Sequence, residues 1–377
     1  MKIGIVCYPT FGGSGVVATE LGMALAQRGH HVHFITYKQP VRLDLIANDI
    51  HFHEVFVEEY PLFHFQPYEL ALSSKMVEVV EMHDLEILHV HYAIPHAYAA
   101  YMAKQMLKEK GIDIKVVTTL HGTDITLVGS HPNYKTAVEF SINNSDVVTT
   151  VSESLKKDTL RLFNITKEIK VIHNFIDFEQ YPEIGYEECK RHTIATKNER
   201  IITHVSNLRP VKRAADVIDI FYKIQKEIPS KLLLVGEGPD REQIECQAKD
   251  LGILDKVLFM GNSNEVNKLL CYSDLFLLPS ETESFGLAAL EAMAARTPVI
   301  STNSGGLPEV NIQGVTGFLS NVGDTDDMAK NGIYILKDLD RLHQFKQNAL
   351  DQAKQFSLQN VLPAYKEVYK EVMANCC

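Results

Sequence analysis

The feature that most constrains the fold is a regular alternation of short apolar runs with longer amphipathic stretches. The apolar runs have the length of β-strands, and the stretches between them have the length of α-helices. Alternation of this kind predicts βαβ units, which build parallel sheets with helices on both faces. The fold class indicated is therefore α/β, and 377 residues suit two domains.

An irregular stretch, HNFIDFEQYP at residues 173–182, divides the alternation into two sets. We expect two Rossmann-like, doubly wound domains, residues 1–172 and 173–361, that face a central cleft. The C-terminal helix, residues 362–377, is expected to pack back on the first domain. The expected strands are residues 1–7, 32–36, 52–57, 87–91, 115–120 and 147–151 in the first domain, and 201–205, 232–235, 257–260, 275–278, 299–301 and 317–319 in the second.

Charge and composition argue against several classes of protein. The net charge of −11 lacks the basic footprint of a nucleic-acid binder. The longest apolar runs have strand length, so no transmembrane helix is expected, and the first residues are typical of a strand instead of a signal peptide. The six cysteines lack metal-type spacing, which favours reduced thiols in a cytoplasmic protein. The adjacent Cys376 and Cys377 are expected at an exposed end.

A glycine-rich loop follows the first expected strand. Residues 13–18, which include Gly13, Ser14 and Gly15, match the dinucleotide fingerprint G-x-G-x-x-A. Glycines let the backbone approach a phosphate closely. The second strand, however, ends in Thr36-Tyr37-Lys38 without the acid that would bind a dinucleotide ribose. Another kind of anion-facing loop, or a plain tight turn, therefore fits better than an NAD or FAD site.

The segment SETESFGLAALEAM, residues 280–293, is the richest in chemistry. A buried strand leads into it, and a helix is expected to begin near Phe285, where free N–H groups would suit a diphosphate. Glu283 precedes this helix and would meet a sugar, whereas Glu291, eight residues later, would meet a ribose. The alternative is that Glu283 only complements the helix dipole and Glu291 is solvated.

Three further loops follow expected strands of the second domain. In SNLRPVKR, residues 206–213, Arg209 offers a planar fork and Lys212 a compact charge for phosphate oxygens, unless the loop is merely basic and solvated. Glycines in VGEGP, residues 235–239, and in SGGLPE, residues 304–309, permit close approach of a ligand.

Together, ESFG-x4-E, RPVKR, LLLVGEGP and SGGLPEV resemble the retaining glycosyltransferases of family 4, which have the GT-B fold. The resemblance covers essentially the whole chain. It implies a nucleotide-sugar donor bound by the second domain without metal or cofactor. It further implies that Arg209 and Lys212 hold the diphosphate, that Glu291 binds the ribose and that Glu283 contacts the sugar. The other donor contacts implied are Gly13, Gly15, Asn207, Gly236, Met260, Ser284, Phe285, Gly286 and Leu287.

In the first domain, CYPTFGGSG, HVHYAIPHA and TTLHGTDIT are similar to the branch of this family that begins bacillithiol synthesis. This similarity implies transfer of N-acetylglucosamine from UDP-N-acetylglucosamine to the hydroxyl of L-malate, with release of UDP. It places His121 near the sugar. The candidate acceptor contacts are Ser14, Tyr92, Thr119 and Thr123, with Arg42, and after it Lys135, as the cation for the malate carboxylates. No metal is expected, because HExxH and Cys/His spacings are lacking.

A front-face reaction fits this resemblance best, because we place no carboxylate beneath the sugar and Asp124 is only the nearest in sequence to His121. Three alternatives stay open: a family 4 enzyme with another small or lipid acceptor, a UDP-sugar 2-epimerase, and a non-catalytic nucleotide-sugar binder. The helix expected at residues 16–27 is not basic, which favours a small soluble acceptor over a membrane. A homo-oligomer is compatible with a chain of this size.

Overall fold

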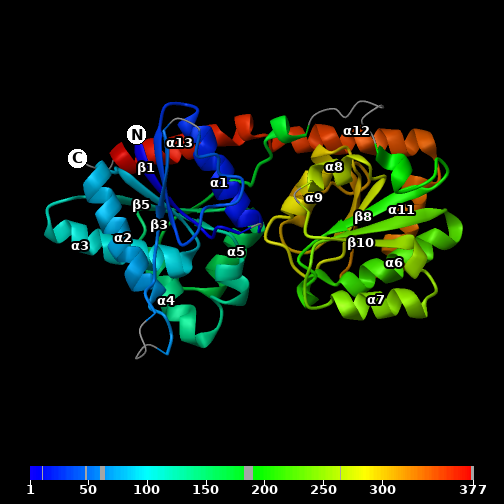
Figure 1. Ribbon diagram of the computed structural model, residues 1–377, viewed down its shortest axis with the longest axis horizontal. Coiled ribbons are helices and arrows are strands. Elements are labelled where there is room, and N and C mark those ends of the chain that lie inside the picture. Colours follow the sequence, from blue (N-terminus) through cyan, green and yellow to red (C-terminus); the bar gives the residue numbers. More distant parts are fainter. Residues whose placement is uncertain (11, 47–48, 60–63, 182–189, 264, 375–377) are drawn as a thin grey trace. The chain divides into compact units, whose positions relative to one another are not determined.

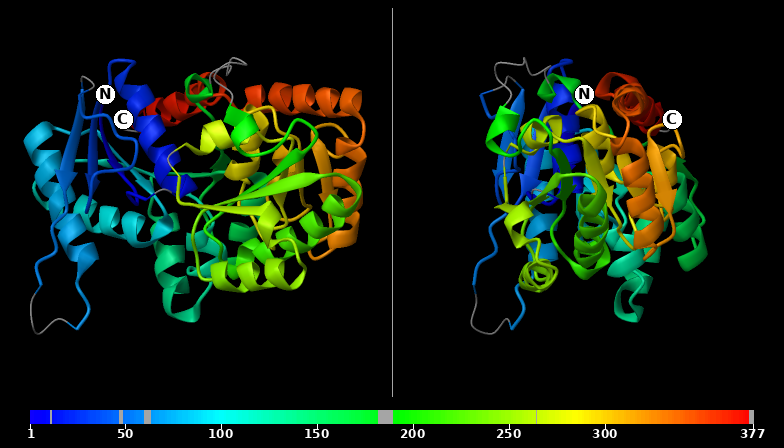
Figure 2. Two further views of the ribbon diagram at one scale, coloured as in Figure 1. Left: turned by 45° about the vertical axis from the view of Figure 1, so that its right-hand side comes forward. Right: turned by 90° about the vertical axis from the view of Figure 1, so that its right-hand side faces the viewer.

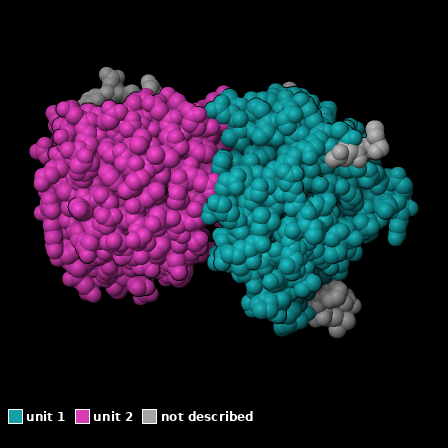
Figure 3. Space-filling model, turned by 180° about the vertical axis from the view of Figure 1, so that it is seen from behind, with its two compact units in different colours: residues 1–174, 359–377 teal, residues 175–358 magenta. Residues whose placement is uncertain are grey.

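The computed structural model describes residues 1–10, 12–46, 49–59, 64–181, 190–263 and 265–374. Cys376 and Cys377 lie outside these residues. The chain divides into two compact units: unit 1 is residues 1–174 with 359–377, and unit 2 is residues 175–358 (Figure 3). Each unit contains one parallel sheet with helices on both of its faces (Figures 1 and 2).

The sheet of unit 1 has seven strands in the order β3-β2-β1-β4-β5-β6-β7, and every neighbouring pair is parallel. Its strands are β1 (Lys2–Val6), β2 (His31–Thr36), β3 (Ile50–Glu54), β4 (Ile87–His91), β5 (Lys115–Leu120), β6 (Val147–Thr150) and β7 (Ile169–Val171). Its helices are α1 (Gly13–Ala26), α2 (Tyr68–His83), η1 (Ala93–Ala97), α3 (Tyr98–Glu109), η2 (Thr123–Leu127), α4 (Pro132–Asn143), α5 (Glu153–Leu162) and α13 (Leu358–Ala374).

The two faces of this sheet differ in chemistry. On one face, Val6, Leu88 and Val90 pack with α2 and α3 in a cluster of buried apolar side chains. On the other face, His89 of β4 hydrogen-bonds Tyr369 of α13, which is fully buried. The C-terminal helix therefore completes the core of unit 1, although all of unit 2 lies between residues 174 and 359 in the sequence.

The sheet of unit 2 has six strands in the order β10-β9-β8-β11-β12-β13, again all parallel. Its strands are β8 (Arg200–Val205), β9 (Ser230–Val235), β10 (Val257–Gly261), β11 (Leu275–Leu278), β12 (Val299–Thr302) and β13 (Gly317–Ser320). Its helices are η3 (Phe178–Gln180), η4 (Lys190–Thr193), η5 (Pro210–Lys212), α6 (Ala214–Glu227), α7 (Arg241–Asp250), η6 (Leu254–Lys256), α8 (Val266–Cys271), α9 (Leu287–Ala294), α10 (Leu307–Val310), α11 (Thr325–Leu336) and α12 (Leu339–Gln355).

Helix boundaries follow local chemistry. The side chain of Ser152 accepts a hydrogen bond from Leu155 N–H and caps α5, and Asp338 caps α12 by accepting from Arg341 N–H. The chain turns after α1 at Gly29, whose φ of +80° favours glycine. Among the described residues, no helix combines the length and the apolar character needed to cross a membrane.

Both sheets reverse their winding at one point, between β1 and β4 in unit 1 and between β8 and β11 in unit 2. Parallel α/β sheets bind ligands beyond the carboxyl ends of the strands at such a switch point. The loops that follow these four strands are therefore where ligands are expected. The predicted alternation of strands and helices in two parallel sheets is confirmed, but β7 was not foreseen.

Candidate functional site

The switch point of unit 2 is bridged by an ion pair between two sequence candidates. Lys212 follows β8 and Glu283 follows β11, and Lys212 Nζ lies 2.6 Å from Glu283 Oε1. The same oxygen accepts a hydrogen bond of 2.8 Å from the hydroxyl of Ser280. Both charged side chains are mostly buried, with 22% and 13% exposed. The pair is thus held in a defined orientation at the edge where a ligand would bind.

A buried histidine ties β8 to β11 behind this ion pair. His204 Nδ1 donates to the carbonyl of Leu277 at 2.8 Å, so its Nε2 can accept from Ser206 Oγ at 2.7 Å. Burial lowers the pKa of His204 to about 4, which keeps the ring neutral at pH 7. Ser206 in turn accepts from the N–H of Leu208 at 3.2 Å. The start of the Lys212 loop is therefore fixed by hydrogen bonds.

Glycines in this region allow neighbouring loops to pack backbone against backbone. A Cβ on Gly236 would lie 1.8 Å from the carbonyl oxygen of Ser206, and a Cβ on Gly305 would lie 2.0 Å from that of Glu283. Both residues have positive φ, +119° and +60°. Gly306 N–H also donates to the Glu283 carbonyl at 2.8 Å. The close contacts between loops require glycine at these positions, independently of any contact with a ligand.

Helix α9 begins at Leu287, two positions later than expected, because Gly286 adopts a left-handed conformation with φ of +97°. The first N–H groups of a helix have no partner within that helix, and those of α9 follow the Glu283 loop directly. Phe285 is buried against Phe356, and the Ser284 and Leu287 side chains are half-buried. Glu291 is half-buried and stands in the fifth position of α9, so it lies just over one turn into the helix.

The remaining donor candidates of unit 2 lie on loops at the same edge. The Arg209 and Asn207 side chains are exposed after β8. Met260, near the end of β10, is 40% exposed. The exposed Arg209 precedes Lys212 by three residues, so the segment after β8 carries two cations, which suits a diphosphate.

In unit 1 the switch point is bridged by neutral hydroxyls. Ser14 follows β1 and Tyr92 follows β4, and their side-chain oxygens are 2.7 Å apart. Burial raises the pKa of Tyr92 to about 12, so the phenol stays protonated and can donate. A hydrogen bond to Thr123, whose side chain is exposed, opposes that rise. Three acceptor candidates, from the segments that follow β1, β4 and β5, therefore lie together.

His121 joins this group through its ring. Its Nε2 is 2.8 Å from His91 Nδ1, and its ring centroid lies 5.2 Å from that of Tyr92. Burial, with the nearby His89 and His96, lowers the pKa of His121 to about 3. The ring is only 9% exposed and neutral at pH 7, so it can exchange hydrogen bonds but does not act as a cation.

Asp124 organises these loops, a role that sequence reasoning did not assign. Its carboxylate accepts from the N–H groups of Ala93 at 2.8 Å, Gly122 at 2.9 Å and His121 at 3.2 Å. Burial raises its pKa to about 6, and these three hydrogen bonds oppose the rise. The short spacing His121-Gly122-Thr123-Asp124 was the available signal, because an Asp often bonds nearby backbone in a turn.

Three other candidates of unit 1 are engaged elsewhere. Thr119 is fully buried, and its hydroxyl lies 2.8 Å from His89 Nε2 and 2.7 Å from Thr149 Oγ1, inside the core. Arg42 pairs with the buried carboxylate of Glu20 at 2.8 Å. Lys135 is exposed and lies 4.0 Å from Glu139.

The two candidate glycines at the start of α1 differ from each other. Gly13 is the exposed first residue of α1. Gly15 is buried, and a Cβ there would lie 2.5 Å from the carbonyl oxygen of Tyr8. Gly15 therefore serves the tight turn between β1 and α1, whereas Gly13 is open to a ligand.

Comparisons with known proteins agree with this architecture. Residues 11–180 match the model of Glycosyltransferase Family 4, and residues 186–352 match that of Glycosyl transferases group 1. N-acetyl-alpha-D-glucosaminyl L-malate synthase of Bacillus anthracis is 48% identical over 374 residues, which cover 99% of this chain and 97% of the relative.

Solved structures show the same fold at lower identity. Anabaena HepE in complex with UDP-glucose has a TM-score of 0.84 and 20% identity, covering 98% of this chain and 100% of that one. Sucrose-phosphate synthase from Thermosynechococcus elongatus has a TM-score of 0.82 and 20% identity, with 100% of both chains covered. By the 48% identity over almost its full length, together with both family models, this chain belongs to the family 4 glycosyltransferases of GT-B fold.

Proposed function

We propose that the chain transfers N-acetylglucosamine from UDP-N-acetylglucosamine to the hydroxyl of L-malate, with release of UDP and retention at the anomeric carbon. This would be the first step of bacillithiol synthesis. The observation that carries the proposal is the 48% identity, over 99% of the chain, to a relative whose name gives this product. The ion pair at the switch point of unit 2 supports a charged donor there.

The donor side rests on unit 2. Lys212 has three N–H groups, so it can keep its contact with Glu283 and also donate to a phosphate oxygen. Arg209 would swing to the other oxygens, because its side chain is exposed. The N–H groups at the start of α9 add partial positive charge. Glu283 would bind the sugar and Glu291 the ribose. The other proposed donor contacts are Gly13, Asn207, Gly236, Met260, Ser284, Phe285, Gly286 and Leu287.

The acceptor side rests on unit 1. Ser14, Tyr92 and Thr123 offer hydroxyls that can donate to carboxylate oxygens. His121 would hydrogen-bond the sugar as a neutral ring. Arg42 would supply the cation only if malate competes with Glu20 for it. We propose structural roles for Gly15 and Thr119, because Gly15 is buried at the start of α1 and Thr119 is buried in the core.

The chemistry we propose is a front-face displacement. The bond between the anomeric carbon and the β-phosphate oxygen breaks, and the malate oxygen bonds to that carbon from the same face. The hydroxyl proton passes to the leaving phosphate, whose charge Lys212 and Arg209 stabilise. Asp124 is a poor nucleophile for a double displacement, because three backbone N–H groups already hold its carboxylate.

The test is release of UDP from UDP-N-acetylglucosamine with L-malate, compared with no acceptor, D-malate and glycerol. Release that requires L-malate, and that persists in excess EDTA, supports the donor, the acceptor and a metal-free reaction. Release without any acceptor, or binding of the nucleotide without turnover, would overturn the proposed acceptor or the proposed catalysis.

The Lys212→Ala variant tests the donor side. We expect kcat to fall by about 100- to 1,000-fold, the usual loss when one group that stabilises developing charge is removed. The exposed Lys330→Ala variant of α11 is the matched control and should turn over normally. Turnover of Lys212→Ala within about threefold of the wild type would remove Lys212 from the mechanism.

A further inference from the structure

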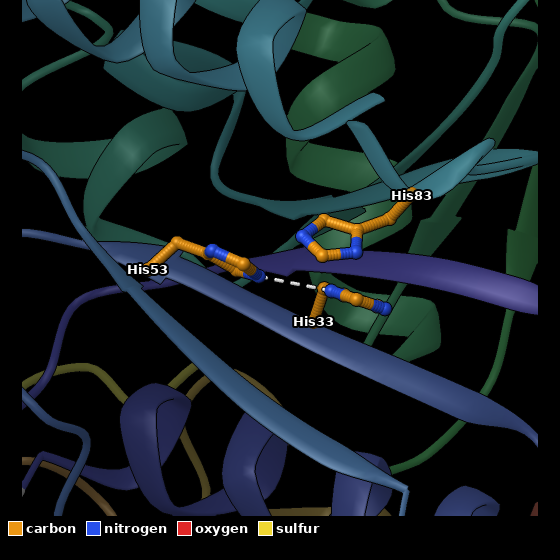
Figure 4. A group of neighbouring side chains, drawn as sticks. All are labelled: His33, His53 and His83. Carbon is orange, nitrogen blue, oxygen red and sulfur yellow. Dashed lines mark hydrogen bonds between the residues drawn. The ribbon is translucent and has the colours of Figure 1, made fainter. Parts of the chain in front are cut away.

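Three histidines converge in unit 1, away from the loops described above. His33 of β2, His53 of β3 and His83 at the end of α2 place ring nitrogens within 4.8 Å of one another. Figure 4 shows the three side chains pointing toward a common centre. His33 Nδ1 and His53 Nε2 are 2.9 Å apart and share one hydrogen.

Strand register brings these rings together. Residues 31–33 and 51–53 both follow the pattern His-x-His, and alternate residues of a strand point to the same face. β2 and β3 pair in parallel with His33 opposite His51, so four histidines share one face. Helix α2 covers this face and ends at His83. The two His-x-His patterns are visible in the sequence, but only the strand register shows that their side chains lie together.

Two of the three rings, His33 and His53, are neutral, which is the form of imidazole that binds a metal ion. Burial and the neighbouring imidazoles of His51 and His83 lower the pKa of His33 to about 3. Burial with the same two neighbours lowers the pKa of His53 to about 4. Both rings are therefore neutral at pH 7 and keep a lone pair on nitrogen.

The charged groups of α2 that act on His53 are paired with each other. Lys75 and Glu78 of α2 act on His53 in opposite directions, and they form an ion pair of 2.8 Å with each other. His31 lies on the same face but is exposed, and its Nδ1 is 2.9 Å from Asp49 Oδ1. A dication would therefore enter a site without a net opposing charge from these groups.

We propose that His33, His53 and His83 bind one divalent transition-metal ion, for which Zn²⁺ is the best fit. Three imidazole nitrogens and one water complete the tetrahedral shell that Zn²⁺ prefers, at about 2.0–2.1 Å for each nitrogen. On binding, the hydrogen shared by His33 and His53 moves to the other nitrogen of its ring, so both facing nitrogens become ligands. His53 and His83 are half-buried, which leaves the ion a route from solvent.

The ion would stabilise the fold instead of taking part in glycosyl transfer. β3 is the edge strand of the sheet and pairs with β2. The proposed acceptor hydroxyls of Ser14, Tyr92 and Thr123, by contrast, come from the segments after β1, β4 and β5. A bound ion would join the edge strand, its neighbour and the end of α2, so it should raise the melting temperature of unit 1.

The experiment is a titration of the full-length chain with ZnCl₂ by isothermal calorimetry, after dialysis against EDTA and then buffer. The background carries Cys376→Ser and Cys377→Ser, because thiolates also bind zinc. The test variant is His53→Gln with His83→Gln, two half-buried positions. The matched control is His343→Gln, an exposed histidine of α12.

We expect one equivalent of Zn²⁺ to bind, and the double variant to bind at least about 100-fold more weakly, since even the partners of metal ligands are worth about 10- to 100-fold in affinity. The control should match the background. Substitution with Co²⁺ should give a tetrahedral spectrum without thiolate charge-transfer bands. Circular dichroism of the metal-free variants verifies that they fold. Equal affinity of the double variant and the control, or no binding to the background at submillimolar Zn²⁺, would overturn the proposal.

Discussion

The two units share one topology but bridge its switch point with different chemistry. In unit 1, the hydroxyls of Ser14 and Tyr92 meet between the loops after the first and fourth strands. In unit 2, the ammonium of Lys212 meets the carboxylate of Glu283 at the equivalent place. The comparison teaches that strand order decides where a site forms, whereas the loop side chains decide what the site binds.

A buried polar contact also ties the C-terminal helix into unit 1. Unit 1 buries His89, Thr119 and Thr149 in one hydrogen-bonded chain that ends on Tyr369 of α13. The core of unit 2 around α6 is a cluster of apolar side chains. A buried series of hydrogen-bonded side chains is stable only while every partner is present, whereas an apolar core tolerates the loss of a few contacts. Unit 1 should therefore be the more easily broken unit.

Deletion of residues 359–377 should produce the largest difference in stability between the two units. It removes Tyr369 and the rest of α13 from unit 1, and it leaves His89 without its partner. We expect unit 1 to unfold and unit 2 to stay folded. Limited proteolysis with mass spectrometry would measure this. Equal protection of both units, as in the full-length chain, would contradict the expected difference.

The second largest expected effect is that acid destabilises unit 1 more than unit 2. Burial lowers the pKa of His89 and His121 to about 3 and of His96 to about 4. Their unfolded forms, with pKa near 6.5, bind protons first, so stability is lost as pH falls below about 6.5.

At pH 5 the three rings are mostly protonated in the unfolded chain and neutral in the folded one, so together they lower the free energy of unfolding by several kcal/mol. Asp124 partly offsets this, because its raised pKa of about 6 makes the folded state take up a proton first. Unit 2 has His204 with a pKa lowered to about 4. Hydrogen exchange at pH 7 and pH 5, corrected for intrinsic rates, should show unit 1 losing more protection. A larger loss in unit 2 would contradict this account.

The Gly305→Ala variant tests whether the position of the ion pair in unit 2 affects turnover. The new Cβ would lie 2.0 Å from the Glu283 carbonyl oxygen, so the loop must shift and move the ion pair. Displacements of about 1 Å lower turnover by about 100-fold, which is the fall in kcat we expect.

Gly314→Ala is the matched control for that variant. Gly314 has a similar φ of +72°, but beyond its chain neighbours no atom of the described residues lies within 4 Å of the Cβ that alanine would add. It should lower stability by about 1 kcal/mol through backbone strain alone and leave kcat unchanged. Equal kcat values for the two variants would show that the contact with Glu283 has no bearing on turnover.

Tyr369→Phe is the smallest perturbation. It removes the 2.7 Å hydrogen bond to His89 Nδ1 and keeps the packing of the ring. The loss of one buried partner should lower the free energy of unfolding by about 1–3 kcal/mol. Chemical denaturation measures the change, with the exposed Tyr134→Phe as control. A change below about 0.5 kcal/mol would mean that the buried polar chain contributes little to unit 1.

The sequence by itself determined the α/β class, the two sets of strands and the loops that carry the candidate site residues. These follow from hydrophobic periodicity and from glycine and charged residues at strand ends, all of which are local properties. The start of α9 was misjudged by two residues, because the left-handed Gly286 cap depends on packing against Leu307.

Only the tertiary structure decided which side chains meet. Lys212 and Glu283 are 71 residues apart, Ser14 and Tyr92 are 78 apart, and His89 and Tyr369 are 280 apart. The sequence likewise could not show that Thr119 is enclosed in the core or that His33 faces His53 and His83. Such contacts depend on strand order and register, which are set by the free energy of the whole packed unit and by no single segment.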